Sequence, residues 1–299
     1  MTESKMTRRE MLIKSAQIFF GGAVLTIGCK KSSRGSLVTK SNVDGFKIGV
    51  CDWTLKKEAD PTVFELAKKL GIDGVQISLG TLKENMNLRE KSIQEKYLEM
   101  AKIHEVEIAS IAIGELNSVP YKNDPRAEAW VLDCIDVCQA MGISVILVPF
   151  FGKADLRKDE EGMDRVIKRL KKAAPIAEKA GVILGLESQL NAEEHMVIID
   201  NVGSPAVQVY YDVGNSHRNG YDILKEIRIL GKYICEFHAK DYENLYGKGI
   251  INFEAVRRAM DDIGYRGWVV MEGNKYPLGL EESLKYDLNY LRDVFPRKV

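Results

Sequence analysis

The chain has 299 residues, of which 45% are hydrophobic and 29% are charged. This composition suits a globular protein with a large core, and the length allows either one large α/β barrel or two smaller domains. Lys and Arg together number 43, as do Asp and Glu, so the formal net charge is zero. Proteins that bind nucleic acid usually carry a basic face, so the balanced charge argues against nucleic acid as a partner.

The first 29 residues differ in kind from the rest. The segment Thr7–Lys14 contains an Arg-Arg pair, and the apolar stretch after it, which ends at Cys29, is too short to span a membrane as a helix. These features resemble a twin-arginine export signal with a lipobox. We expect residues 1–29 to be this signal, 30–45 a flexible tether and 46–299 the catalytic domain. The expected location is the periplasm or cell surface of a bacterium, with an N-terminal lipid as the membrane anchor.

The other four cysteines are expected to be buried thiols. Cys51 and Cys235 lie in or next to apolar runs, while Cys134 and Cys138 are four residues apart on one face of a predicted helix. Two cysteines at that spacing on a helix rarely form a disulfide, and the chain has no Cys-x-x-Cys or Cys/His metal spacing.

From residue 46 onward, short apolar runs alternate with segments whose apolar residues recur at helical spacing. The predicted strands are 46–52, 74–79, 106–113, 144–150 and four runs that end at residues 187, 212, 238 and 272. The predicted helices are 61–70, 88–104, 125–141, 163–180, 192–201, 221–230, 253–263 and 280–294. Start and stop signals support several of these helices, such as Asp124 before and Gly142 after the third one.

Eight strand–helix units in about 250 residues are typical of a (β/α)₈ barrel. The main alternative, an open doubly wound sheet, usually has a Gly-rich phosphate-binding turn after its first strand. Here the residues at and after the end of the first strand, Asp52-Trp53-Thr54-Leu55, contain no glycine. The sequence therefore predicts an α/β protein with a single (β/α)₈ TIM barrel.

Each of the last four predicted strands ends in a side chain that can bind a metal, namely Glu187, Asp212, His238 and Glu272. Active sites of such barrels lie at the C-terminal ends of the strands, so we expect the four side chains to meet. Without a cation, three facing carboxylates would repel one another and shift each other's pKa. An oxygen-rich set suits Mn²⁺ best, with Mg²⁺, Co²⁺ or Zn²⁺ also possible. The sequence thus predicts one divalent cation.

The motifs around these strand ends are distinctive. They are Gly185–Glu187, Tyr211–Asn215, Phe237–Asp241, Gly247–Phe253 and Val270–Gly273. Together they resemble the xylose isomerase-like TIM-barrel superfamily, and within it the sugar phosphate isomerase/epimerase group. The resemblance implies that Glu187, Asp212, His238 and Glu272 hold one divalent metal. It also implies that Glu187 and Glu272 act as acid and base on either face of a sugar carbon.

The reaction implied is the isomerisation or epimerisation of a small carbohydrate. Removal of a proton next to a carbonyl gives an enediolate, which a metal stabilises, and a second carboxylate returns the proton on the opposite face. The same first step followed by loss of a leaving group would instead make the protein a metal-dependent lyase or hydrolase of 3-keto-glycosides. A third alternative is a non-catalytic carbohydrate-binding lipoprotein, although the presence of Glu187 and Glu272 argues against it.

Four further residues are predicted to contact the substrate, and three of them have an alternative role. Trp53 either stacks on a sugar ring or belongs to the core. Asn215 stands where related sequences often carry His, and His217 either takes that role or lies at the surface. Lys240 either binds a substrate oxygen or phosphate, or pairs with Asp241. Because an exported enzyme would rarely meet sugar phosphates, the expected substrate is a free sugar or a glycoside.

Overall fold

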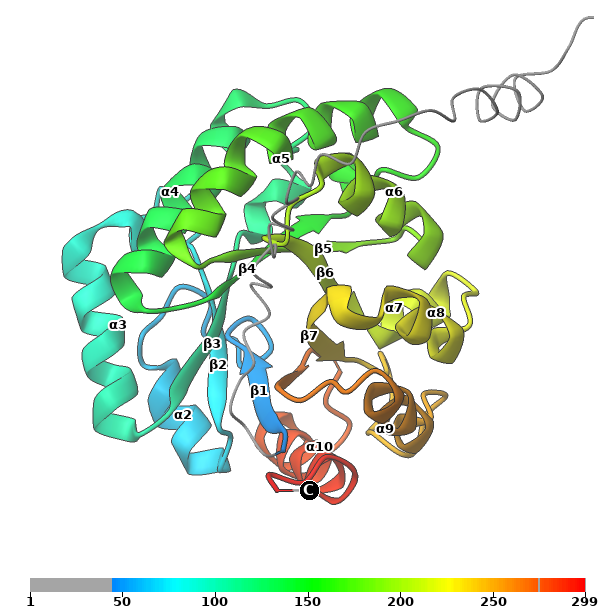
Figure 1. Ribbon diagram of the computed structural model, residues 1–299. Coiled ribbons are helices and arrows are strands. Elements are labelled where there is room, and N and C mark those ends of the chain that lie inside the picture. Colours follow the sequence, from blue (N-terminus) through cyan, green and yellow to red (C-terminus); the bar gives the residue numbers. More distant parts are fainter. Residues whose placement is uncertain (1–44, 274, 299) are drawn as a thin grey trace, which may run out of the picture. The chain divides into compact units, whose positions relative to one another are not determined.

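The computed structural model describes residues 45–273 and 275–298. The predicted export signal at 1–29, and all of the predicted tether except residue 45, lie outside the described residues. Within the described part, eight parallel strands form a closed barrel in the order β1 to β8 (Figure 1). The prediction of a single (β/α)₈ barrel is confirmed.

The strands are short and lie close to their predicted positions. They are β1 (Lys47–Cys51), β2 (Gly74–Ser78), β3 (Glu107–Ala112), β4 (Val145–Phe150), β5 (Ile183–Ser188), β6 (Val207–Asp212), β7 (Ile234–Ala239) and β8 (Trp268–Met271). The barrel closes because β1 pairs with β8 as well as with β2. Every residue of β2, β4 and β6 is buried, as expected for parallel strands covered on both faces.

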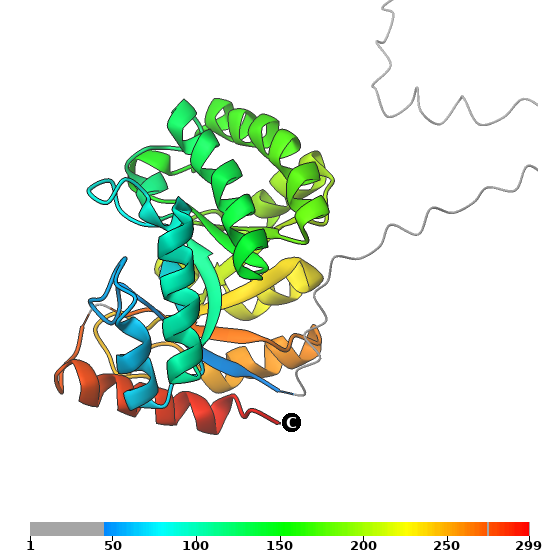
Figure 2. The same cartoon turned by 90° about the vertical axis from the view of Figure 1, so that its left-hand side faces the viewer.

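Helices surround the barrel on its outside. The α-helices are α2 (Val63–Leu70), α3 (Lys91–His104), α4 (Pro125–Met141), α5 (Glu160–Ala180), α6 (Ala192–Val202), α7 (Val213–Arg218), α8 (Ile223–Leu230), α9 (Phe253–Asp262) and α10 (Leu280–Val294). Single 3₁₀ turns are η2 (Asn87–Arg89), η3 (Gly114–Asn117), η4 (Gly152–Ala154) and η5 (Gly231–Tyr233). The last helix, α10, packs against both α9 and α2, which completes the ring of helices (Figures 1 and 2).

Local signals explain why some helix bounds match the prediction and one helix was missed. For α4, the Asp124 side chain accepts a hydrogen bond from the Arg126 backbone N–H at 2.9 Å, and Gly142 ends the helix with a φ of 70°. The sequence pattern predicts no helix at α7, because six residues are too few to show a helical period. Its first turn is capped by the Asp212 side chain, which accepts a hydrogen bond from the Asn215 backbone N–H, and Gly214 lies against Lys240 of the next strand end.

Two cores hold the barrel together. A large apolar core lies between the strands and the helices. A smaller one fills the barrel interior and consists of Cys51, Ala109, Ala112, Val145, Leu147, Ile183, Tyr210 and Val270. Cys51, Cys134 and Cys138 are buried and Cys235 is partly buried, all as free thiols, while Cys29 lies outside the described residues. No helix in the described part of the chain is both long enough and apolar enough to cross a bilayer.

Candidate metal centre

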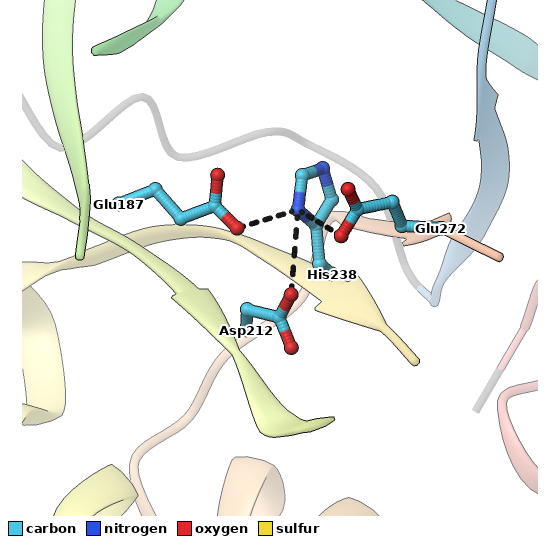
Figure 3. Close-up of side chains that lie close together, drawn as sticks. All are labelled: Glu187, Asp212, His238 and Glu272. Atoms are coloured by element: carbon cyan, nitrogen blue, oxygen red, sulfur yellow. Dashed lines mark hydrogen bonds and ion pairs between the residues drawn. The ribbon is translucent and has the colours of Figure 1, made fainter. Parts of the chain in front are cut away.

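Four side chains at the ends of consecutive strands point toward one another (Figure 3). Glu187, Asp212 and His238 come from β5, β6 and β7, and Glu272 directly follows β8. The Nδ1 atom of His238 lies 3.1 Å from Glu187 Oε1, 3.5 Å from Glu272 Oε2 and 4.0 Å from Asp212 Oδ2. One potential ligand atom from each residue lies within 4.8 Å of the other three. The structure therefore brings together the four predicted ligands.

The donor set and one buried oxygen fit a cation. Asp212 Oδ1 accepts a hydrogen bond from the Asn215 backbone N–H at 2.8 Å, which caps α7. Asp212 Oδ2 is buried without a hydrogen bond among the described residues, and its nearest positive charge is Lys240 Nζ at 3.6 Å. Burial raises the pKa of Asp212 well above its ordinary value; Lys240 opposes this rise, whereas Glu272 and Glu187 add to it. A divalent cation would supply the charge that this buried carboxylate lacks.

A chain of buried hydrogen bonds orients His238 from inside the barrel. His238 Nε2 lies 2.9 Å from Gln76 Oε1, and Gln76 Nε2 donates to Ser110 Oγ at 2.9 Å. Ser110 Oγ in turn donates to Glu236 Oε2 at 2.8 Å. Because the amide N–H of Gln76 is directed to Ser110, its carbonyl oxygen faces the imidazole and accepts from Nε2–H. The other imidazole nitrogen, Nδ1, is thereby turned toward the three carboxylates.

The two titratable groups in this series of hydrogen bonds, Glu236 and His238, differ in their charge. Burial raises the pKa of Glu236 to about 8, so this carboxyl is mostly protonated at neutral pH. Burial alone would lower the pKa of His238, but the charges of Glu187 and Glu272 raise it above its ordinary value. The deep interior is thus close to neutral, while negative charge is concentrated at the barrel mouth.

Glu272 is held as an anion by two donors. Lys240 Nζ donates to its Oε2 at 2.8 Å, and the indole N–H of Trp53 donates to its Oε1 at 3.3 Å. Burial would raise the pKa of Glu272, but Lys240 and His238 lower it to about 2. Burial would likewise lower the pKa of Lys240, whereas Glu272, Asp212 and Glu187 raise it above its ordinary value. These contacts fix the carboxylate beside the cluster.

A cavity of about 450 Å³ opens beside the four residues. It is lined by Trp53, Glu58, Ala112, Gly114, Glu115, Asn117, Ser118, Leu147, Pro149, Phe151, Glu187, Asn215, Lys240 and Glu272. Such a volume is within the range of small-molecule sites. The strands β3 and β4 and the loops after β1, β3 and β4 supply most of the lining, and of these residues only Trp53 was predicted from the sequence. The rest follow the same rule of strand C-termini, but apart from Glu58 and Glu115 they carry no charge that would single them out.

Three of the four predicted substrate contacts line this cavity. Trp53 and Lys240 do so beside Glu272, and Asn215 does so beside Glu187, to whose Oε1 it donates at 3.4 Å. His217 is exposed on α7 and is not part of the lining, so this geometry does not support its predicted role. The same holds for the alternative in which Lys240 pairs with Asp241, because Lys240 pairs with Glu272 and Asp212.

Asp241 has a structural role next to the site. Its carboxylate accepts hydrogen bonds from the backbone N–H groups of Ile250 at 3.2 Å and Ile251 at 3.3 Å. Asp241, two residues after the end of β7, therefore fixes the loop that leads into α9. Tyr242, one residue further on, donates from its hydroxyl to Asn215 Oδ1 at 2.8 Å and so holds the Asn215 amide in place.

Comparisons with known proteins agree with this architecture. A family model described as "Xylose isomerase-like TIM barrel" matches residues 64–294. The chain is 25% identical over 252 residues to D-psicose 3-epimerase of Enterocloster bolteae, which covers 78% of this chain and 84% of the relative. It is 24% identical over 199 residues to 2-epi-5-epi-valiolone 7-phosphate 2-epimerase of an Actinoplanes species, covering 65% of this chain and 72% of the relative.

A solved structure gives the same fold. The apo form of 3-keto-D-glucoside 4-epimerase from E. coli superposes with a TM-score of 0.70 at 17% identity, and the match covers 83% of this chain and 99% of that one. The family match over residues 64–294 confirms, at the level of the family, the resemblance inferred from the motifs at the strand ends.

Proposed function

The chain belongs to the xylose isomerase-like TIM-barrel family, and on this premise we propose that it is a divalent-metal-dependent sugar isomerase or epimerase. The observation that carries the proposal is the placement of Glu187 and Glu272. Figure 3 shows them on opposite sides of His238, each directed toward the centre of the cluster. Both also line the cavity, so a ligand bound there would have a carboxylate on either side. The curated relatives described above are named as epimerases, which supports the same class of reaction.

Glu187, Asp212, His238 and Glu272 would hold the cation. When bound, it would polarise a sugar carbonyl and so acidify the neighbouring C–H. Glu187 and Glu272 exchange roles with the direction of the reaction, one removing the proton and the other returning it to the opposite face. The loss of the proton leaves an enediolate, and its return on the other face inverts the carbon.

The neighbours of the two carboxylates set their positions. Asn215 and His238 contact Glu187, while Trp53 and Lys240 contact Glu272. Two carboxylates with separate donors can differ in protonation, which an acid and base pair requires. The indole of Trp53 also offers the cavity a flat apolar surface, against which the C–H face of a sugar ring can pack.

The test is proton exchange in D₂O. Protein loaded with Mn²⁺ would be incubated with a panel of ketoses and 3-keto-glycosides, and deuterium incorporation next to the carbonyl would be followed by NMR. We expect incorporation with at least one member of the panel and its loss in Glu187→Gln. Glu99→Gln, an exposed residue of α3 outside the cavity, is the matched control and should exchange normally.

Other outcomes identify the alternatives. Release of the aglycone from a 3-keto-glycoside, dependent on the same carboxylates, would indicate a lyase or hydrolase. Saturable carbohydrate binding without exchange or product formation would indicate a binding protein. Binding of Mn²⁺ without any effect of the panel would contradict a role in carbohydrate chemistry.

We also propose that the protein is exported and anchored by a lipid at Cys29. The proposal is supported by the Arg-Arg pair and the apolar run that precede this cysteine. Expression of the full chain in a bacterium that recognises such signals, followed by fractionation, tests it. The protein should sediment with membranes, and Cys29→Ala should move it to the soluble periplasmic fraction.

A further inference from the structure

We propose that the cavity accepts an uncharged carbohydrate and discriminates against sugar phosphates, and that Glu58 and Glu115 cause this discrimination. The inference rests on the proposed function, because it concerns the substrate of the same site. Epimerases named for phosphorylated and for unphosphorylated substrates both occur among the relatives, so the comparisons do not decide between the two classes. The charges that line the cavity do.

Four carboxylates and one ammonium group line the cavity in the described part of the chain. Glu187 and Glu272 belong to the metal centre, while Glu58 and Glu115 lie on the loops after β1 and β3. Asp212, just behind this lining, adds a further negative charge. A bound divalent cation together with Lys240 would still leave carboxylates in excess, so a phosphate dianion entering the cavity would meet net repulsion.

Lys240 is the single cationic residue of that lining and is already engaged. Its Nζ lies 2.8 Å from Glu272 Oε2 and 3.6 Å from Asp212 Oδ2. Phosphate sites usually present Arg, Lys or backbone N–H groups that are free to converge on the anion. A phosphate could reach Lys240 only by competing with two carboxylates that are held in place, one of which the proposed reaction uses.

Glu58 and Glu115, here called the two outer carboxylates, are close enough to influence each other. Glu115 is fixed by the Leu82 backbone N–H, which donates to its Oε1 at 3.0 Å, and by Ser118 Oγ, which donates to its Oε2 at 3.1 Å. Partial burial raises the pKa of Glu58 above its ordinary value, and the charges of Glu115 and Glu84 raise it further. Glu58 and Glu115 therefore place negative charge on the part of the cavity wall that the loops after β1 and β3 supply.

The remainder of the lining suits a neutral sugar. Trp53, Leu147 and Phe151 provide apolar surface for the C–H faces of a ring. Carboxylates accept hydrogen bonds and do not donate them when ionised, so Glu58 and Glu115 can each receive sugar hydroxyl groups. The same two side chains that attract hydroxyls repel a phosphate, which makes them the determinants of the choice.

Binding measurements test the inference independently of turnover. Protein loaded with Mn²⁺ would be titrated calorimetrically with a series of ketohexoses, their 6-O-methyl ethers and their 6-phosphates. The methyl ether enlarges the same position without charge. We expect ketoses and methyl ethers to bind within about threefold of each other and the phosphates to bind about tenfold more weakly or worse. In the double variant Glu58→Gln/Glu115→Gln this gap should shrink to about threefold or less, while Glu99→Gln should leave it unchanged.

Three results would overturn the inference. They are a 6-phosphate that binds as tightly as its parent ketose, a gap that the double substitution leaves intact, and no binding by any uncharged member. Thermal unfolding of each variant shows whether it is folded. Proton exchange, measured separately, tests the proposed function. If sugar phosphates undergo the fastest proton exchange, the inference about the substrate is wrong and the proposed function stands. If neutral sugars bind selectively but no exchange occurs, the proposed function is wrong and the inference stands.

Discussion

The two halves of the barrel mouth contribute different things to the site. The half formed by β5 to β8 supplies three carboxylates and an imidazole whose ligand atoms lie within 4.8 Å of one another. The half formed by β1 to β4 supplies most of the cavity wall, including Trp53 and Phe151, and the two outer carboxylates. Groups that share a cation must offer electron pairs from positions close together, whereas the wall of a cavity has to match the shape of the ligand. Four predictions test how far the metal centre and the cavity wall act independently of each other.

The largest effect is expected from Asp212→Asn. An amide can still cap α7, but it removes a negative charge from the predicted ligand set. We expect proton exchange to fall by at least about 10³-fold, which equals about 4 kcal/mol, and Mn²⁺ affinity to fall as well. Asp222→Asn is the matched control, because Asp222 caps α8 in the same way and is not one of the four clustered residues. Equal effects of the two substitutions would show that the cap, and not the charge, is what matters.

A smaller effect concerns stability in acid. His195 on α6 is buried behind the charged half, with its Nε2 2.9 Å from Ser188 Oγ and its Nδ1 3.0 Å from the Asn191 carbonyl oxygen. Burial lowers its pKa from 6.5 to about 4, so the folded protein binds this proton less readily than the unfolded chain. The stability of the folded protein that depends on neutral His195 is complete above pH 6.5 and is lost as the pH falls from there toward 4.

Between pH 6.5 and 4 the free energy of unfolding is expected to fall by at most about 3 kcal/mol through His195. Urea unfolding at a series of pH values measures it, and His195→Gln should flatten the dependence between pH 6.5 and 4. A slope that is unchanged in the variant would assign the acid sensitivity to other groups.

The third prediction concerns Gln76, a residue of β2 that reaches across the barrel to His238. In Gln76→Leu the imidazole loses the acceptor that fixes its Nε2–H, so we expect Mn²⁺ affinity to fall by about 10 to 100-fold. Gln76→Glu retains an acceptor oxygen and should recover part of the affinity. Calorimetry of Mn²⁺ binding gives the readout without reference to activity. If both variants bind Mn²⁺ like the original protein, the two halves are less dependent on each other than the hydrogen bonds indicate.

The smallest effect is expected from Trp53→Phe. The aromatic wall remains, but Glu272 loses the indole donor at 3.3 Å while it keeps Lys240. Loss of one weak donor to a charged group corresponds to about 1.5 kcal/mol or less, so the rate of exchange should fall by about tenfold at most, with KM nearly unchanged. Trp53→Ala removes the wall as well and should raise KM. A similar KM in both variants would argue against contact between the indole and the substrate.

The sequence anticipated the charged half of the mouth better than the other half. Glu187, Asp212, His238 and Glu272 stood out because a charge at the end of an apolar strand needs a partner, and eight strand–helix units implied that the strand ends meet. The wall residues Leu147, Pro149 and Phe151 gave no such signal, because apolar residues at a strand end are equally compatible with the core. The role of Gln76 likewise depends on tertiary structure, since its partner His238 lies on β7, three strands away around the barrel.

By itself, the sequence determined the alternation of strands and helices, the barrel and the four strand ends that meet. These features depend on periodicity, caps and the cost of burying a charge, all of which are local in the chain. Tertiary structure alone decided the engagement of Lys240 with Glu272 and Asp212, the position of His217 outside the cavity lining, and the cavity itself. Each of these depends on distances between residues that are remote in sequence, and only the closed barrel sets those distances.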